Sequence, residues 1–200
     1  MTDEGYIKFQ CDWTESAPPS HPLLSTLMAW RDRLYGLGLI GVYRDGIGYG
    51  NISVRDGGRG CVISGSGTGL LAKLDERGYT RVISADIVGN RVVCVGPVRA
   101  SSETMSHMAV YGSAPDAGAV IHVHHPAAWN ALLGKIPTTD VAAAYGTPEM
   151  AREIGRLVRA EEHRSGGIVA MAGHRDGLIA YGRDPDAAGE ILLAHVGPFI

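Results

Sequence analysis

Apolar residues recur at three- and four-residue intervals in several parts of this 200-residue chain. That interval is the period of an α-helix with one buried face. It predicts helices over residues 23–35, 103–111, 126–133, 147–158 and 184–192. Thr147-Pro148-Glu149 supports the fourth of these, because a capping residue followed by proline is typical of a helix start. We expect Ser102 to cap the second.

Short runs of β-branched and other apolar residues predict strands between the helices. Two runs, 49–54 and 60–64, flank the turn sequence Asp56-Gly57-Gly58, which predicts a hairpin. Further strands are predicted over residues 81–86, 91–95, 119–124, 167–172 and 178–181. Since several strands are paired as hairpins, we predict one α/β domain with a mostly antiparallel or mixed sheet. Residues 1–19 are interpreted as an irregular lead-in, and residues 20–200 as the single domain.

Composition excludes several classes of protein. With a net charge of −3 and no run of basic residues, the chain lacks the positively charged surface typical of nucleic-acid-binding proteins. No apolar run approaches the ~20 residues of a membrane span. The three cysteines are odd in number and widely spaced, so we expect no disulfide framework and a reducing cytoplasm. What stands out is 28 glycines and eight histidines, and their positions carry the functional hypothesis.

The strongest candidate for chemistry is the run Val120-Ile-His-Val-His-His-Pro126. Alternate side chains on a strand share a face, so His122 and His124 point the same way. Two imidazoles on one face form a platform for an ion such as Zn²⁺, which then needs a third protein ligand. The alternative is a pair of hydrogen-bonded sheet histidines. His125 faces the opposite way, and we assign it a structural role.

Two histidines are candidates for the third ligand. His174 lies at a predicted strand end among glycines, which permit close approach of the backbone, although an ordinary turn histidine also fits. His107 lies four residues after Glu103 on a predicted helix. The two therefore share a face, and His107 is either a ligand or a partner of Glu103.

Glu103 and two small-residue loops complete the candidates. Glu103 follows Ser101-Ser102 at a helix N-terminus, where the helix dipole favours a carboxylate. The functional alternative is a general acid/base beside a metal. The two serines with free amides can hold an anion, and residues 64–69, Ser-Gly-Ser-Gly-Thr-Gly, form a second candidate cradle. That loop is no Walker motif because the required lysine is missing.

The order and character of these motifs along the chain resemble the class II aldolase/adducin family of metal-dependent sugar-phosphate aldolases. The resemblance covers about residues 23–195. It rests on Gly50-Asn51-Ile52-Ser53, residues 64–69, Ser101-Ser102-Glu103, His122-Val-His124, and Gly173-His174 before Gly177. The helix start Gly146-Thr-Pro-Glu149 also looks like the family's helix after the histidine pair.

The resemblance implies a fold and a site. The fold would be a three-layer α/β/α domain. His122, His124 and His174 would bind Zn²⁺, with Mn²⁺, Co²⁺, Ni²⁺ or Fe²⁺ as other ions that three histidines accept. Glu103 would be the catalytic acid/base. A substrate phosphate would be held by Asn51, Ser66, Gly67, Ser101 and Ser102.

The resemblance also implies an activity and an assembly. The activity would be that of a lyase: aldol or retro-aldol cleavage of a C–C bond through a metal-stabilised ene-diolate. The substrate would be a small hydroxy-carbonyl compound, with or without a phosphate group. The assembly would be a homotetramer with active sites between subunits.

The chain departs from the family in the elements that help to determine which substrate is bound. Residues 125–145 form a shorter segment than in typical sugar-phosphate aldolases, without a match for the tyrosine that serves a neighbouring subunit's site. Tyr145 falls too late to be its equivalent. A dehydratase, an epimerase or a decarboxylase on the same scaffold therefore stays open. A non-catalytic adducin-like module is less favoured because all three candidate metal-binding histidines remain. A cupin is less favoured because no glutamate follows His124 at the spacing of that family.

Overall fold

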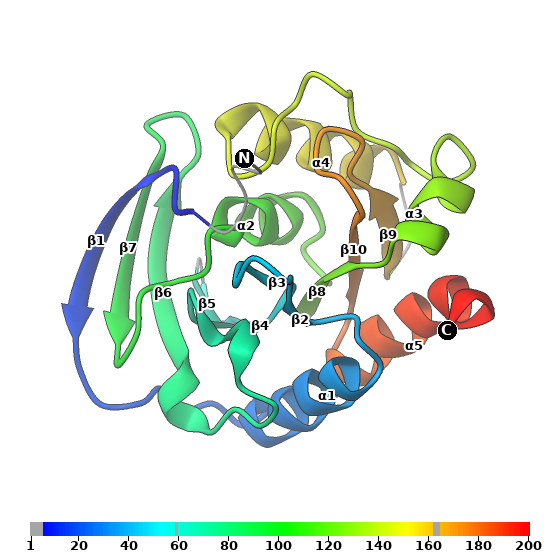
Figure 1. Ribbon diagram of the computed structural model, residues 1–200. Helices are drawn as coiled ribbons and strands as arrows, with labels where there is room; N and C mark the ends of the chain where they lie inside the picture. Colours follow the sequence, from blue (N-terminus) through cyan, green and yellow to red (C-terminus); the bar gives the residue numbers. More distant parts are fainter. Residues whose placement is uncertain (1–5, 59, 162–164) are drawn as a thin grey trace.

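A central mixed sheet organises the computed structural model, which describes residues 6–58, 60–161 and 165–200. Within these residues, eight strands form one sheet in the order β1-β7-β6-β5-β4-β8-β10-β9 (Figure 1). The strands are β1 (Gln10–Glu15), β4 (Asn51–Asp56), β5 (Gly60–Ser64), β6 (Tyr79–Asp86), β7 (Arg91–Gly96), β8 (Ala119–His124), β9 (Gly167–Ala170) and β10 (Gly177–Gly182). Only β1 and β7 pair in parallel among these neighbours. The mostly antiparallel sheet is confirmed.

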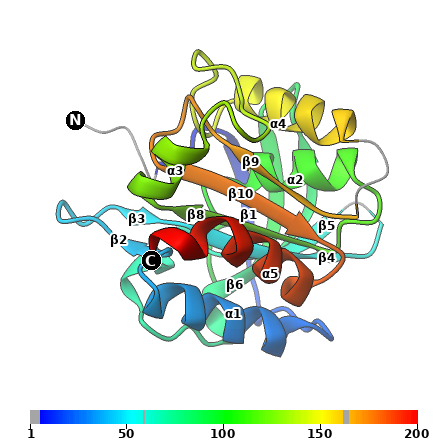
Figure 2. The ribbon, with the colours of Figure 1, turned by 90° about the vertical axis from the view of Figure 1, so that its right-hand side faces the viewer.

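Helices cover both faces of this sheet. They are α1 (Leu24–Gly36), α2 (Thr104–Ser113), α3 (Pro126–Leu132), α4 (Pro148–Ala160) and α5 (Pro185–Val196). Helices α2 and α4 pack together on one face, and α1 and α5 lie on the other (Figure 2). The molecule is therefore a three-layer α/β/α domain, as the resemblance implied. Thr147 caps α4 as predicted, its hydroxyl accepting a hydrogen bond from Met150 N at 3.3 Å.

The alternation of side chains along β8 sorts its residues between two hydrophobic clusters. Val120 belongs to the cluster beneath α2 and α4, whereas Ile121 and Val123 belong to the cluster beneath α1 and α5. His122 and His124 have the same parity as Val120, so both imidazoles lie on the α2–α4 side. The strand is buried along its whole length, which places these polar rings in the interior.

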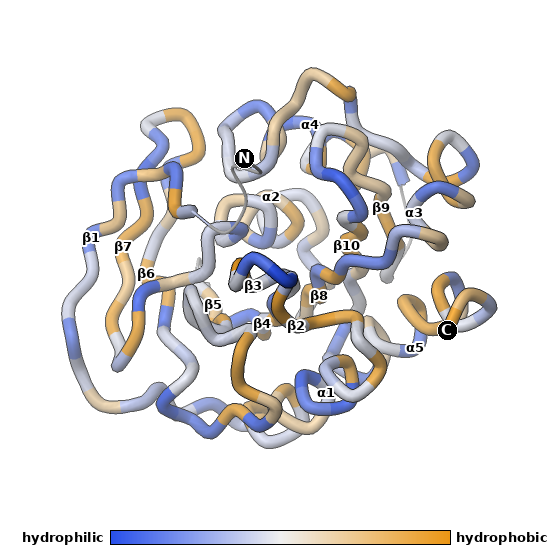
Figure 3. Tube along the Cα trace, viewed as in Figure 1, coloured by the Kyte–Doolittle hydropathy of each residue, from blue (hydrophilic) through white to orange (hydrophobic). Residues whose placement is uncertain are grey.

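A small hairpin, β2 (Gly41–Val42) and β3 (Gly48–Tyr49), precedes β4 and pairs outside the main sheet. Its turn is hydrophilic in Figure 3. Gly50 joins the hairpin to β4 with a φ of +77°, a conformation that favours glycine. A Cβ at this position would lie 2.7 Å from Ile40 Cγ1 and 3.2 Å from the carbonyl oxygen of His122. Gly50 therefore lets the hairpin lie directly against the strand that carries the histidines.

The expectation of an irregular lead-in is wrong for residues 10–15, which form β1 and belong to the main sheet. The Trp13 indole also donates to the carbonyl oxygen of Gly96 at 2.9 Å. This strand depends on a partner about 80 residues away, and a local pattern of apolar residues carries no sign of such pairing. Residues 1–5 of the predicted lead-in lie outside the described residues.

Candidate metal centre

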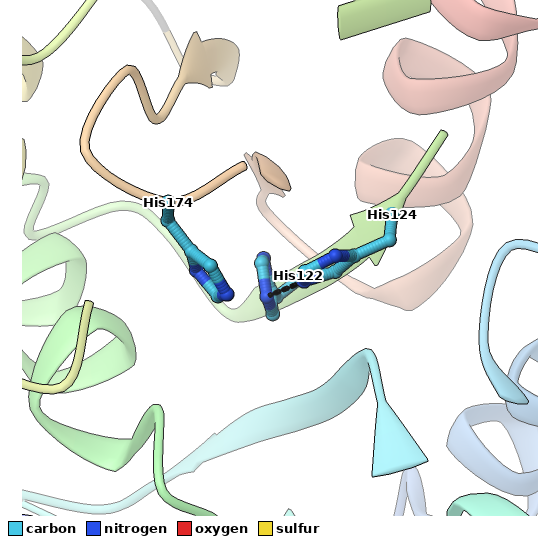
Figure 4. A group of neighbouring side chains, drawn as sticks. All are labelled: His122, His124 and His174. Atoms are coloured by element: carbon cyan, nitrogen blue, oxygen red, sulfur yellow. Dashed lines mark hydrogen bonds between the residues drawn. The ribbon is translucent and has the colours of Figure 1, made fainter. Parts of the chain in front are cut away.

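Three buried histidines from two segments converge at one end of the sheet (Figure 4). His122 and His124 come from β8, and His174 comes from the loop between β9 and β10. One ring nitrogen from each lies within 4.8 Å of the others, and Nε2 of His122 is 3.0 Å from Nε2 of His124. His174 closes on the pair because Gly177 has no side chain: a Cβ there would lie 3.2 Å from both His122 Cε1 and His174 Cγ.

The outward-facing nitrogens of the two strand histidines have defined partners. Nδ1 of His122 lies 3.0 Å from the carbonyl oxygen of Leu178 on β10. Nδ1 of His124 lies 2.7 Å from the hydroxyl of Tyr43, in the turn of the β2–β3 hairpin. With Nδ1 so engaged, each ring turns its Nε2 toward the other. This is the arrangement of metal-ligating histidines, whose second nitrogen is held by a hydrogen bond.

Burial holds these imidazoles in their neutral form. It lowers the pKa of His122 and of His124 well below the usual value, and the neighbouring His174 lowers both further. Neutral imidazole is the form that binds a metal ion. The donor set therefore fits a divalent ion of the zinc type.

The carboxylate of Glu103 lies beside the cluster, buried at the start of α2. Its Oε2 accepts a hydrogen bond from Ser106 Oγ at 2.7 Å. Its Oε1 has no hydrogen-bond partner among the described residues and lies 3.9 Å from His174 Nδ1. The expected cap at Ser102 is wrong, because Glu103 occupies the N-cap position, where its amide donates to Ser101 Oγ at 3.3 Å. One carboxylate oxygen is thus available to a substrate.

The histidines and Glu103 line a cavity of about 260 Å³. The other described lining residues come from segments 46–51, 65–69 and 101–102, together with Tyr6 and Tyr145. All five residues expected to hold a phosphate are among them: Asn51, Ser66, Gly67, Ser101 and Ser102. The volume lies just below the ~300–1,000 Å³ of typical ligand pockets, so a small substrate fits it. No lysine or arginine is among the described lining residues.

The cavity-lining loop of residues 65–69 is held in place by hydrogen bonds from outside the cavity lining. The amide of Ser66 donates to the carbonyl oxygen of Arg99 at 2.9 Å. Gly67 adopts a φ of +77°. The buried guanidinium of Arg31 donates to the carbonyl oxygens of Thr68 at 2.9 Å and Ala72 at 3.1 Å. Arg31, which is not among the lining residues, thus holds the loop in place.

Four tyrosines at the site were missed in the sequence: Tyr6, Tyr43, Tyr49 and Tyr145. Tyr145 lines the cavity and stacks on His174, with ring centroids 4.8 Å apart. Its place just before the helix start at Gly146-Thr147 was a usable signal. Tyr43 contacts His124, and no sequence pattern pairs residues 81 positions apart.

The side chain of His107 neither belongs to the cluster of potential metal ligands nor bonds to the side chain of Glu103. Its Nδ1 lies 2.7 Å from Ser53 Oγ, and the ring is fully buried beneath the site. His125 has the structural role expected of it, because its Nδ1 accepts a hydrogen bond from Ala128 N at the start of α3.

Comparison with known proteins adds a family and a fold. The family model for the class II aldolase and adducin N-terminal domain matches residues 43–195. A solved L-fuculose 1-phosphate aldolase is 24% identical with a TM-score of 0.65, covering 90% of this chain and 84% of that one. The L-fuculose-1-phosphate aldolase from Thermus thermophilus is 26% identical, with a TM-score of 0.59 and coverage of 88% and 86%. A sugar-phosphate aldolase from Thermotoga maritima is 16% identical, with a TM-score of 0.59 and coverage of 88% and 95%. No curated protein matches the sequence significantly.

Proposed function

Because this chain belongs to the class II aldolase and adducin family, we propose that it is a divalent-metal-dependent lyase. It forms or cleaves a C–C bond in a small hydroxy-carbonyl compound. The observation that carries the proposal is the convergence of three buried imidazoles and a carboxylate at one end of a small cavity. No other described residues form a comparable cluster of potential metal ligands.

In this proposal one group of lining residues carries the reaction and a second group binds the substrate. An ion held by His122, His124 and His174 would act as a Lewis acid toward the carbonyl and hydroxyl oxygens of the substrate. Glu103 is the acid/base: its Oε1 takes the proton from the carbon next to the substrate carbonyl when a C–C bond forms at that carbon, and returns the proton to the carbon when the bond is cleaved. Ser106 Oγ donates to Oε2, which keeps Oε1 directed into the cavity.

A second group of lining residues binds a phosphate group on the substrate. Asn51, the hydroxyls of Ser66, Ser101 and Ser102, and Gly67 are the groups we assign to it. Asn51 lines the cavity, and its side-chain NH₂ is a neutral donor for an anion. Neutral donors with the positive end of α2 can hold an anion without lysine or arginine.

Metal analysis tests the centre. Purified protein should contain about one equivalent of Zn²⁺ or a similar divalent ion per chain, and the double variant His122→Ala/His124→Ala should contain none. The matched control is His125→Asn, which changes the adjacent histidine but keeps a side chain able to cap α3. Retention of the ion by the double variant, or its loss from the control, would contradict the assignment.

Glu103→Gln tests the acid/base role. The variant should keep its metal and lose kcat by 10²-fold or more, because general acid–base catalysis typically contributes about 10²–10⁴-fold. The assay is a panel of ketose and aldose phosphates and 2-keto-3-hydroxy acids, with products of cleavage, dehydration, epimerisation and decarboxylation measured separately. An unchanged kcat would refute the role of Glu103. Dehydration, epimerisation or decarboxylation without cleavage would assign another reaction to the same site.

The anion end has its own test. Inorganic phosphate should inhibit competitively against the substrate, and Ser66→Ala with Ser102→Ala should weaken that inhibition. Absence of any effect of phosphate would indicate a substrate without a phosphate group.

Assembly and location complete the proposal. We propose a homotetramer acting in the cytoplasm on a small molecule. The three free cysteines, Cys11, Cys61 and Cys94, support a reducing compartment. No helix among the described residues is long and apolar enough to cross a membrane. Light scattering after size-exclusion chromatography measures the assembly, and a monomer at micromolar concentration would contradict the tetramer.

A further inference from the structure

We infer that the β2–β3 hairpin is a positioning element of the metal centre, and that the Tyr43 hydroxyl sets the orientation and tautomer of His124. This inference rests on the proposed metal site. It assigns a role to a residue that neither contacts the substrate nor binds the ion.

The contact between hairpin and ligand is direct. The Tyr43 hydroxyl lies 2.7 Å from His124 Nδ1. Tyr49, on the same hairpin, packs its ring 4.5 Å from the Tyr43 ring and 5.5 Å from the His124 ring, measured between centroids. On the side of the hairpin, the imidazole therefore packs against two aromatic rings and has a polar contact with the Tyr43 hydroxyl.

Backbone contacts in the turn and at the base of the hairpin fix the position of Tyr43. The Tyr43 amide donates to the carbonyl oxygen of Ile47 at 2.8 Å, and its own carbonyl accepts from Gly46 N at 2.9 Å. At the base, a Cβ on Gly69 would lie only 2.3 Å from Gly41 O and 3.0 Å from Gly48 Cα. This backbone-to-backbone packing seats the hairpin on the loop that follows β5.

A neutral imidazole carries one N–H, and the other nitrogen is the ligand. Nε2 of His124 faces the other histidines, so its lone pair has to be directed at the ion. Nδ1 then carries the hydrogen and donates it to the Tyr43 oxygen. His122 uses the carbonyl oxygen of Leu178 in the same way. A phenol oxygen accepts this hydrogen bond without adding the negative charge of a carboxylate, so the positive charge of the ion is left for the substrate.

The test compares two variants that each lose one hydroxyl from the hairpin. Tyr43→Phe removes the partner of His124. Tyr49→Phe is the matched control, because it keeps the ring that packs on His124 and removes a hydroxyl whose partner is Gly38 O, at 3.1 Å, and not a histidine. Zn²⁺ affinity is measured on the full chain by competition with a chelator, and the absorption spectrum of the Co²⁺ form reports the ligand geometry. Thermal unfolding of the chelator-treated proteins shows that each variant is folded.

Loss of such an outer partner typically costs 10–100-fold in metal affinity. We expect Tyr43→Phe to lose affinity in that range and to shift the Co²⁺ bands, and Tyr49→Phe to stay within about twofold of the unsubstituted protein. Equal losses in both variants, or no loss in Tyr43→Phe, would overturn the inference. If the unsubstituted protein binds neither Zn²⁺ nor Co²⁺, the proposed metal centre itself fails, and that result is distinguishable from failure of the role of Tyr43.

Discussion

The buried ring of His107 makes the stability of this protein depend on pH in a way that one substitution can isolate. His107 lies on α2, one turn after Glu103, and its Nδ1 contacts Ser53 Oγ. Ser53 Oγ in turn lies 2.8 Å from the Tyr111 hydroxyl. His107 Nε2 has no hydrogen-bond partner among the described residues. Burial lowers the pKa of His107 from 6.5 to about 3.

The sign and size of the effect follow from that shift. Between pH 6.5 and pH 3 the unfolded chain binds a proton at this site and the folded chain does not, so the free energy of unfolding falls as the pH falls. At 1.36 kcal/mol per pKa unit, the complete loss is about 5 kcal/mol. Between pH 7 and pH 5 alone, His107 contributes about 2 kcal/mol of that loss. Above pH 7 it contributes no pH dependence.

The substitution His107→Asn removes the titrating group and places an amide near the position of Nδ1, where it can still reach Ser53. We expect the variant to be less stable at pH 7 because the shorter side chain leaves a cavity. Its loss of stability between pH 7 and pH 5 should nevertheless be about 2 kcal/mol smaller than in the unsubstituted protein. Denaturant unfolding at pH 7, 6 and 5, in the presence of a chelator to remove metal linkage, measures both. Parallel curves, agreeing within about 0.5 kcal/mol, would refute the assignment of a neutral buried histidine.

Two further substitutions, one of them with a control substitution, test how the site is supported. Gly173→Ala would place a Cβ 1.9 Å from Ala143 O, so the backbone beside His174 must shift. We expect the free energy of unfolding to fall by about 1–3 kcal/mol and Zn²⁺ binding to weaken. Gly112→Ala, with open space on α2, should instead stabilise by about 0.5–1 kcal/mol, and similar results for both in thermal unfolding would contradict this interpretation. Arg31→Met removes two charged hydrogen bonds to carbonyl oxygens, and we expect it to lower the free energy of unfolding by about 2–4 kcal/mol and to weaken inhibition by phosphate. Denaturant unfolding and inhibition assays measure the two effects. Unchanged inhibition would show that Arg31 does not support the anion site.

The helices and the antiparallel strands were predictable because their signals are local. Thr147-Pro148 starts α4, and the turn at Asp56-Gly57-Gly58 joins β4 to β5. The orientation of His122 and His124 followed from the two-residue period of a strand. The missed elements depend on distant partners. Strand β1 is stabilised by parallel pairing with β7, and Tyr43 meets His124 only after the hairpin folds back over β8.

The sequence by itself determined which residues this protein brings to its chemistry: a strand with two histidines on one face, a carboxylate at a helix start, and glycine and serine loops. Only the tertiary structure decided which of several candidates complete the site. It selected His174 over His107, because Gly177 leaves room for one ring whereas Ser53 engages the other. It also brought Tyr43 and Tyr145 to the histidines. The physical reason is that a metal centre is defined by distances in space, and apolar periodicity along a chain fixes only which side of each element is buried.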